Sequence, residues 1–316
     1  MLKRILFGAA LALASTAAIY PAPPILKRAE LGFAVSTNAA LQNLKSTEFT
    51  SAWRMGYYGA DDSPRMIYTS TSAACSLNSG NGDGGSQIKL ADGNCAVATF
   101  GGNHPSVRVF GAKGDGSNDD TPAFQAYVNW LAQNGAGRLV IPRGYYCIKT
   151  GPITTSQQGI SFEGENRYGA TVMDACGADV SIFNLSGTND AIRHLQILGA
   201  DVPGTTHPAV MLTGGSSGCV ECTLEDVYIS RGQNAVYANA YEVYIKWSRF
   251  ERSYGDATVL LQNTGGYYFR NKTDDWFPRA TPTALPITIA NWAASTAVTQ
   301  DQIVLSGGYL LQAMTT

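Results

Sequence analysis

The sequence predicts an all-β fold, a solenoid of short strands entered through one amphipathic helix. Val210, Val236 and Val259 sit in comparable strand-like segments 26 and 23 residues apart, a spacing typical of one solenoid coil per segment. Only 15% of the residues are charged, against roughly 25% in an average globular chain, and 34 residues are glycine. One coil cannot bury its own inner face, so neighbouring coils must stack to form a core.

A helix is expected at Thr121–Gln133. Pro122 suits its first turn, and a side-chain oxygen of Asp120 or Thr121 can accept the free N–H groups there. The apolar residues that follow at helical spacing form one stripe, which must pack on the strands; they are Ala123, Phe124, Tyr127, Val128 and Leu131.

Strands are expected on both sides of this helix. Val107 and Val109 predict a short apolar strand, which runs into a Gly- and Asp-rich loop at Gly111–Asp120. After the helix, Gly135 and Gly137 interrupt the pattern, and Leu139–Ile141 begins a strand that ends at Pro142.

From Arg138 onward, short strands alternate with turns. Alternation of side chains places Val227 and Ile229 inside and Tyr228 outside, and Val243 and Ile245 inside with Tyr244 outside. The strand candidates are Val180–Leu185, Ile192–Leu198, Ala209–Thr213, Leu224–Ser230, Ala235–Ala238, Val243–Trp247, Ala257–Gln262 and Tyr267–Asn271.

The run V-F-G-A-K-G-D-G-x-x-D-D-T-x-A-F-Q from Val109, followed by G-x-L-x-I-P-x-G-x-Y from Gly137, resembles the entry segment of the pectate-lyase-like right-handed β-helix family. This family includes polysaccharide lyases, glycoside hydrolases of the polygalacturonase kind and bacteriophage tailspikes. The resemblance implies a right-handed, single-stranded parallel β-helix whose N-terminal helix plugs the first coil. The fold does not carry an activity by itself.

The acidic loop before the helix has two interpretations. Asp115, Asp119 and Asp120 lie close together, as in a calcium loop, but the EF-hand spacing and its closing Glu are absent. Asx-turns and a helix cap account for all three carboxylates. We therefore interpret these aspartates as structural.

The chain is expected to divide into five parts. Residues 1–20 carry Lys3 and Arg4 before an apolar run, the layout of a secretory signal peptide that is too short to span a bilayer; a buried helix that anchors the protein in an assembly is the alternative. Residues 21–52 form a Pro-containing linker and a short helix at Thr37–Leu44. A small β module at 53–104, the β-helix at 105–275 and a linker with a further unit at 276–316 follow.

The two flanking modules have their own resemblances. Strands of the first are expected at Met55–Tyr58, Met66–Thr69, Gln87–Leu90 and Ala96–Phe100, and its G-Y-Y and G-D-G-G-S-Q-I segments resemble a small module found ahead of the plug in tailspike-like proteins. The last unit resembles small sugar-binding modules of chitinases and tail proteins, with Val298 where an aromatic residue is usual. We expect the polypeptide to continue beyond Thr316.

Six cysteines fit an exported chain with disulfides. A bridge between Cys75 and Cys95 closes a hairpin-sized loop. Cys219 and Cys222 have metal-ligand or redox spacing, but the chain has no second C-x-x-C to complete a zinc site. A bridge and a free buried thiol stay open alternatives for Cys147, Cys176, Cys219 and Cys222.

Composition and motifs argue against several classes of function. A net charge of −2 without a Lys/Arg cluster gives no field for nucleic acid. No G-x-S-x-G is present, and the three histidines, His104, His194 and His207, have no evident partner in the sequence. We expect no metal, no cofactor and no membrane span.

Candidate site residues lie on the outer side of the later coils. Asp226 and Glu251 are the candidate catalytic carboxylates, because adjacent coils can bring them onto one face, and glycoside hydrolysis needs two carboxyl groups. The candidate substrate-binding residues are Tyr228, Tyr237, Tyr244 and Arg249; an Arg beside a uronate would serve a lyase. The alternative is that these carboxylates are ordinary surface residues at turns.

The resemblance implies a protein that binds or cleaves a polysaccharide, as a lyase or a glycoside hydrolase. The alternative is a non-catalytic structural or receptor-binding protein of a phage tail, in which the β-helix is a spacer. The resemblance to tailspikes further implies a homotrimer, other virion tail proteins as partners, and a secreted or virion location.

Overall fold

The computed structural model describes residues 33–101, 105–215, 218–251, 253–254, 259–262, 265–274, 303–306 and 309–312. The signal-like segment 1–20 lies outside these residues. So does most of the unit expected at 276–316, of which β24 (Ile303–Ser306) and β25 (Tyr309–Gln312) form an antiparallel pair. Among the described residues, no helix is both long enough and apolar enough to cross a membrane.

A five-stranded sheet opens the described chain. Its strands are β1 (Phe33–Val35), β2 (Ser51–Arg54), β3 (Met66–Ser70), β4 (Gln87–Lys89) and β5 (Cys95–Thr99), in the order β1-β2-β3-β5-β4. Only β1 and β2 pair parallel, and the other neighbours pair antiparallel. Helix α1 (Asn38–Gln42) begins where the Thr37 hydroxyl accepts a hydrogen bond from the Ala40 N–H, 3.1 Å away. It lies within Thr37–Leu44, where the sequence predicts a short helix.

Two details of this module differ from the sequence prediction. Met55–Tyr58 is not a strand, because the chain turns where the Asp62 carboxylate accepts hydrogen bonds from the N–H groups of Tyr57, Tyr58 and Gly59. The sheet also includes β1, which lies in the range 21–52 that we assigned to a linker and short helix. The division of the chain at the expected boundaries stays a prediction.

Helix α2 (Thr121–Gln133) forms where the sequence predicts it. Its apolar stripe is buried, and the Phe124 ring meets the Tyr146 ring edge-on with centroids 5.3 Å apart. The helix therefore covers the inner face of the first coil, which would otherwise be open to water. The segment before it differs from the prediction, since Val107–Phe110 is a short 3₁₀ helix instead of a strand.

The aspartates before α2 bind main-chain N–H groups. Asp115 accepts from the N–H groups of Ser117 and Asn118 in an Asx-turn. Asp120 does not cap the helix as expected; its carboxylate accepts from the Lys113 N–H at 2.6 Å. Asp119 takes the capping role by accepting from the Thr121 N–H. The structural interpretation of the three carboxylates agrees with these bonds, although the loop also contains a strand, β6 (Asp115–Asp119).

Three parallel sheets form the β-helix, and successive coils add their strands to these sheets in turn; β6, which lies before α2, is an additional strand at the end of one sheet. The sheets are called here the first, second and third coil sheets. The first coil sheet contains β7 (Gly137–Val140), β10 (Ile160–Glu163), β13 (Ala191–Arg193), β16 (Cys222–Glu225), β19 (Glu242–Lys246) and β22 (Gly265–Phe269). The second contains β6, β8 (Gly144–Cys147), β11 (Thr171–Asp174), β14 (Gln196–Leu198), β17 (Tyr228–Ser230), β20 (Arg249–Glu251) and β23 (Lys272–Asp274). The third contains β9 (Ile153–Thr155), β12 (Phe183–Leu185), β15 (Val210–Gly215), β18 (Val236–Ala240) and β21 (Val259–Gln262).

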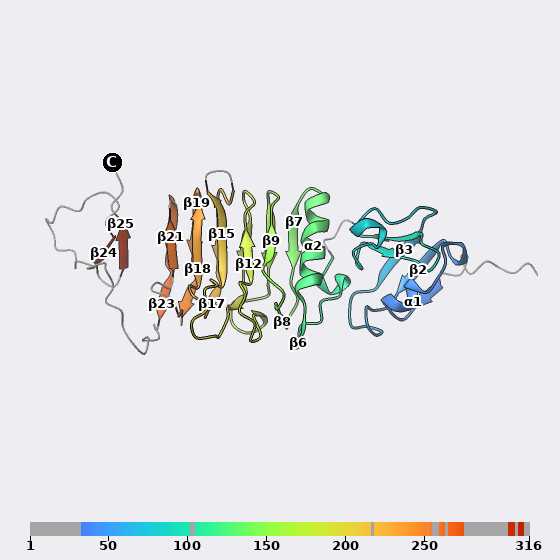
Figure 1. Ribbon diagram of the computed structural model, residues 1–316, viewed down its shortest axis with the longest axis horizontal. Helices are drawn as coiled ribbons and strands as arrows, with labels where there is room; N and C mark the ends of the chain where they lie inside the picture. Colours follow the sequence, from blue (N-terminus) through green and yellow to red (C-terminus); the bar gives the residue numbers. More distant parts are fainter. Residues whose placement is uncertain are drawn as a thin grey trace, which may run out of the picture.

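The predicted right-handed parallel β-helix is confirmed. In Figure 1 the N-terminal sheet lies at one end, α2 stands beside it, and the coils follow in chain order along the long axis. Val210 pairs with Val236, and Val236 with Val259, so the valine spacing does mark successive coils. Stacked side chains fill the interior; under the second coil sheet the column is Tyr146, Met173, Ile197, Ile229 and Phe250, all buried.

Two of the expected strands are each divided into two. Ile192–Leu198 becomes β13 and β14, and Leu224–Ser230 becomes β16 and β17. The breaks fall at His194 and Asp226, which adopt positive φ angles of 56° and 50° and turn the chain from the first coil sheet to the second. The predicted alternation holds, since Val227, Ile229, Val243 and Ile245 are buried while Tyr228 and Tyr244 are half-buried.

All six cysteines form disulfides. Cys75–Cys95 is confirmed, and the other two bridges are Cys147–Cys176 and Cys219–Cys222. The free-thiol alternative for the last four cysteines is therefore wrong in this structure. Cys147 ends β8 and Cys176 follows β11, so their bridge joins adjacent coils.

A ladder of alternating charges crosses the first coil sheet. Glu163, Arg193, Glu225 and Lys246 stand in register on successive coils. Arg193 Nε lies 3.2 Å from a Glu225 carboxylate oxygen, and Lys246 Nζ lies 3.4 Å from the same oxygen. Opposite charges directly across a strand pair stabilise the stacking, so this face has a structural explanation.

Candidate functional site

The corners between the first and second coil sheets place Asp226 beside two basic side chains. Asp226 Oδ1 lies 3.0 Å from Arg167 Nη1, and Oδ2 lies 3.1 Å from His194 Nδ1. His194 and Asp226 each directly follow a strand of the first coil sheet, on consecutive coils. The His194 N–H donates to the Glu225 carbonyl, and the Asp226 N–H to the Lys246 carbonyl, so the corners stack as the strands do.

Register on the second coil sheet brings together three of the predicted residues. Tyr228 stands opposite Arg249, and Ser230 opposite Glu251, on β17 and β20. The Tyr228 hydroxyl donates a hydrogen bond to Glu251 Oε2 at 2.6 Å, and Arg249 forms an ion pair with Glu251 Oε1. Glu251 is only 9% exposed, so its carboxylate needs polar partners, and Tyr228 and Arg249 provide them.

Tyr168 connects the two groups. Arg167 lies over the Tyr168 ring, 4.8 Å from its centroid, and the Tyr168 and Tyr228 centroids are 6.2 Å apart. Tyr168 is 54% exposed. We name the connected set the Asp226 cluster; its members are Arg167, Tyr168, His194, Asp226, Tyr228, Arg249 and Glu251.

The Asp226 cluster combines aromatic faces with charged, hydrogen-bonding groups at the surface. Aromatic rings provide flat apolar area with a polar edge, and guanidinium groups bind carboxylates. A sugar chain presents C–H faces and hydroxyl groups, and acidic sugars add carboxylates. The arrangement is therefore chemically suited to a saccharide, and it includes two carboxylates and a histidine that can exchange protons.

A second group borders the same sheet. Arg231 Nη1 lies 3.5 Å from Asp174 Oδ2, and Arg231 Nε lies 3.6 Å from Asp201 Oδ2. The Tyr145 hydroxyl donates to Asp174, and the Tyr254 hydroxyl donates to Asp201. Burial and the bond to Asp174 raise the pKa of Tyr145 to about 12, so this hydroxyl keeps its proton at neutral pH and acts as a donor.

The other two predicted binding residues lie on different sheets. Tyr237 belongs to β18 in the third coil sheet, and its hydroxyl donates to Gln262 Oε1 at 3.0 Å. Tyr244 belongs to β19 in the first coil sheet, and its hydroxyl donates to Glu242 Oε1 at 2.6 Å. Neither residue lies on β17 or β20, the strands that carry Tyr228, Arg249 and Glu251, because each belongs to a different sheet.

Sequence reasoning missed Arg167, Tyr168 and His194. The expectation that the histidines have no partner is wrong for His194, which meets Asp226, and for His207, whose Nδ1 lies 3.1 Å from Asp179 Oδ1. His104 lies outside the described residues. The signal that could have found His194 is its equal position on the preceding coil, 32 residues before Asp226.

In the described part of the chain, no three His, Cys, Asp or Glu side chains are grouped to hold a metal ion.

Comparisons with known proteins identify the fold. Protein-family models and curated protein sequences gave no match. Among solved structures, the enzymatically active domain of tailspike protein 4 of bacteriophage CBA120 has 14% identity and a TM-score of 0.53, over 75% of this chain and 33% of that one. WceF of Pantoea stewartii, a glycan biofilm modifying enzyme with a tailspike-like parallel β-helix fold, has 15% identity and a TM-score of 0.52, over 69% and 32%.

A third similar structure is tailspike protein gp49 of the Acinetobacter baumannii bacteriophage Fri1, a capsular polysaccharide depolymerase, with 13% identity and a TM-score of 0.51 over 70% of this chain and 47% of that one. The chain spans about a third of the length of the first two proteins and less than half of the third. At these identities the likeness concerns the fold alone. The chain has the parallel β-helix fold of phage tailspikes, as its entry segment predicts.

Proposed function

We propose that this protein binds a polysaccharide across the second coil sheet, with the Asp226 cluster as the point of contact, and that it cleaves the bound chain. The observation that carries the proposal is the unbroken series of contacts from His194 through Asp226, Arg167, Tyr168 and Tyr228 to Glu251. This series joins aromatic surface, cations and two carboxylates on neighbouring coils. The fold shared with polysaccharide-modifying proteins supports it.

In this proposal each residue has a stated role. Tyr228 and Arg249 contact the sugar, together with Tyr168, while Asp226 and Glu251 supply the carboxylates of the reaction. A lyase would use a base and a cation beside a uronate, for which His194 and Arg167 are available at Asp226. A glycoside hydrolase would use the two carboxyl groups as acid and base or nucleophile. Tyr237 and Tyr244 stay predictions for contacts on other faces.

One observation favours a non-catalytic alternative. Each carboxylate of the cluster already has two partners, Arg167 and His194 for Asp226, and Tyr228 and Arg249 for Glu251. Such satisfied networks also occur as purely structural features. The second candidate function is therefore an adhesin that binds a polysaccharide without cleaving it.

Incubation with a panel of bacterial and plant polysaccharides tests the proposal. Reducing ends together with the ultraviolet absorbance of unsaturated uronates would identify a lyase, because elimination conjugates the new double bond with the carboxylate. Reducing ends alone would identify a hydrolase. Binding of a panel member without products would support the adhesin. A panel that is neither bound nor cleaved would contradict both candidates.

We further propose a secreted or virion location. Three disulfides suit a chain that folds in an oxidising compartment, and tailspikes supply the fold comparison. A homotrimer that contacts other tail proteins is part of the same proposal. Light scattering on the full polypeptide measures its mass in solution, and the mass of a single chain would contradict the trimer.

A further inference from the structure

A small pocket lies where the N-terminal sheet meets the segment that leads into α2. Its volume is about 210 Å³, and its lining residues are Tyr57, Tyr58, Asp62, Arg108, Ala112 and Lys113. Pockets for drug-sized ligands measure roughly 300–1,000 Å³, so this one suits a single small group. It is separate from the Asp226 cluster, with which it shares no residue.

The tyrosine wall of the pocket is held in place from behind. Arg54 is fully buried, and its guanidinium lies 5.1 Å from the centre of the Tyr57 ring. On Gly111, which has a φ of 102°, an added Cβ would come within 2.7 Å of the Tyr57 ring. The Tyr58 hydroxyl donates to the Gly111 carbonyl at 2.8 Å. Both rings are therefore fixed before any ligand arrives, which lowers the entropic cost of binding.

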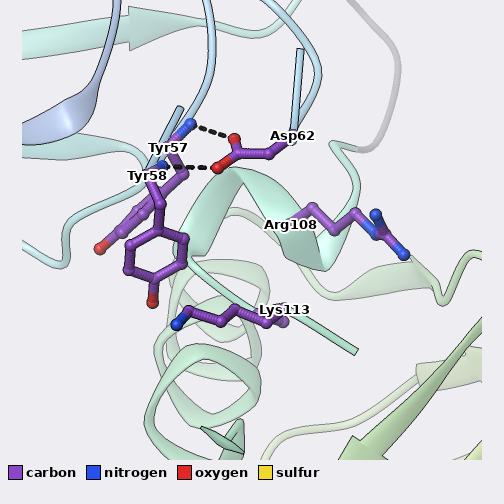
Figure 2. A pocket seen from close by; sticks show the side chains of 6 residues that line it. Tyr57, Tyr58, Asp62, Arg108 and Lys113 are labelled. Carbon is purple, nitrogen blue, oxygen red and sulfur yellow. Dashed lines mark hydrogen bonds between the residues drawn. The ribbon is translucent and has the colours of Figure 1, made fainter. Parts of the chain in front are cut away.

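The only acid in the lining is committed to the main chain. Asp62 Oδ1 accepts from the Tyr57 N–H at 2.6 Å, and Oδ2 accepts from the N–H groups of Tyr58 and Gly59 at 2.8 and 2.7 Å. Figure 2 shows the carboxylate turned toward the tyrosines, while the Arg108 guanidinium points the other way. Asp62 thus stabilises the turn and forms no ion pair with the cations of the pocket.

Two cations line the pocket without a carboxylate partner among the described residues. Lys113 Nζ lies 4.6 Å from the centre of the Tyr58 ring and 3.1 Å from Asn118 Oδ1, a neutral acceptor. Arg108 Nη2 donates to the Arg143 carbonyl at 2.9 Å, and its buried Nε has no acceptor. Figure 2 shows Lys113 below Tyr58, and the Arg108 side chain running away from the two tyrosines. The lining therefore offers the Lys113 ammonium, which forms no ion pair among the described residues, beside exposed aromatic surface, since Tyr58 is 55% exposed. The carboxylates of Asp62, Asp115 and Asp120 act on the same ring from a longer range.

We propose that this pocket is a second saccharide site, which binds one carboxylate-bearing sugar residue, a uronate. The Lys113 ammonium would bind the sugar carboxylate through a charge-assisted bond, and the apolar face of the sugar would lie on Tyr58. A neutral sugar would leave the Lys113 ammonium without an anion, so the pocket discriminates by charge.

Calorimetric titration of the full chain with glucuronate tests this site, with glucose and acetate as matched probes. We expect glucuronate to bind, and glucose and acetate each to bind at least roughly tenfold more weakly, because each lacks one half of the recognised group. Lys113→Gln should weaken glucuronate binding by a similar factor. Lys89→Gln, which removes an exposed lysine bonded to Asn81 outside the pocket, should leave binding unchanged.

The outcomes separate this site from the Asp226 cluster. Glucuronate binding that falls in Arg167→Gln and not in Lys113→Gln would overturn the pocket proposal and leave the proposed function intact. Equal binding of glucuronate and acetate, or no binding of glucuronate, would also overturn it. Circular dichroism of each variant confirms that the fold is retained; if Lys113→Gln fails to fold, Tyr58→Ala, which removes the aromatic face from the pocket, tests the same site.

Discussion

At the residue scale, the left-handed corner at Asp226 determines what the cluster can do. Asp226 has a φ of 50°, which Gly, Asn and Asp adopt more readily than other residues. In this conformation its carboxylate contacts Arg167 and His194, which lie on the two preceding coils. The sequence predicts Asp226 as a surface acid but not its partners. Those partners lie on other coils, and their distance from Asp226 depends on the lengths of the loops in between, which the sequence pattern does not define.

Two substitutions at this corner separate conformation from charge. Asp226→Asn keeps a residue that tolerates the left-handed region, so we expect a loss of at most about 1 kcal/mol in the free energy of unfolding, in line with exposed ion pairs. Asp226→Val adds a β-branched side chain that disfavours this φ, and we expect a loss larger by roughly 1–3 kcal/mol. Urea unfolding measures both variants. Equal losses would show that the corner conformation carries no energetic weight.

Asp120 makes stability depend on pH. Burial raises the pKa of its carboxyl to about 6, from its ordinary value of 3.8. The folded state therefore binds a proton more tightly than the unfolded state does, and the free energy of unfolding contributed by this group increases as the pH falls from about 6 to about 4. The increase should be on the order of 2 kcal/mol.

Urea unfolding at several pH values between 4 and 7 checks this contribution. We expect Asp120→Asn to remove the rise on acidification. Below about pH 4 the opposite trend should begin, because hydrogen bonds hold the pKa of Asp119 below its usual value and protonation of that group costs stability. A variant with the same pH dependence as the parent chain would contradict the assignment.

At the element scale, helix α2 is the part that the sequence predicts most completely. Its apolar spacing, Pro122 and the following glycines define its bounds without tertiary information. The strands are predicted less well, because Ile192–Leu198 contains no Gly or Pro and its apolar residues predict one continuous strand. The corner that divides it is occupied by His194, neither Gly nor Pro, and is stabilised by a hydrogen bond to Glu225 on the next coil. No local signal marks such a corner.

Phe124→Asp should strongly destabilise the protein, by more than about 4 kcal/mol, because it places an unpaired charge between the plug helix and the first coil. Phe124 is fully buried against Tyr146. Asn129→Asp on the exposed side of the same helix is the control and should be nearly neutral. Thermal unfolding compares them, and similar melting temperatures for the two variants would refute the plug role.

The disulfides should differ in their contributions. Cys147–Cys176 closes a loop with a sequence separation of 29, and Cys219–Cys222 one with a separation of 3. Because a longer loop gains more from closure, replacing the first pair by Ala should cost on the order of 3 kcal/mol beyond the lost packing, and the second pair clearly less. Guanidinium unfolding of both double variants measures this difference, and the reverse order would contradict it.

At the scale of the whole molecule, the solenoid explains both the success and the failure of the sequence prediction. Inward positions repeat from coil to coil, so the spacing of Val210, Val236 and Val259 in the sequence is sufficient to assign them to successive coils. Outward residues meet across coils whose lengths vary: 32 residues separate His194 from Asp226, while the equivalent corner at Trp247 follows Asp226 after only 21 (247 − 226 = 21). Asp226 and Glu251 could be chosen for one side of the molecule, but the residues that connect them could not.

The central claim is that the second coil sheet binds a polysaccharide through the Asp226 cluster. The most direct test is a binding isotherm for a polysaccharide that the panel identifies, measured with the parent chain, Tyr168→Ala and Tyr241→Ala. Tyr168 lies in the cluster, and Tyr241, an exposed tyrosine between β18 and β19 and outside the cluster, is the matched control. We predict that Tyr168→Ala weakens binding at least roughly tenfold and that Tyr241→Ala leaves it unchanged. Unchanged binding in Tyr168→Ala would contradict the claim.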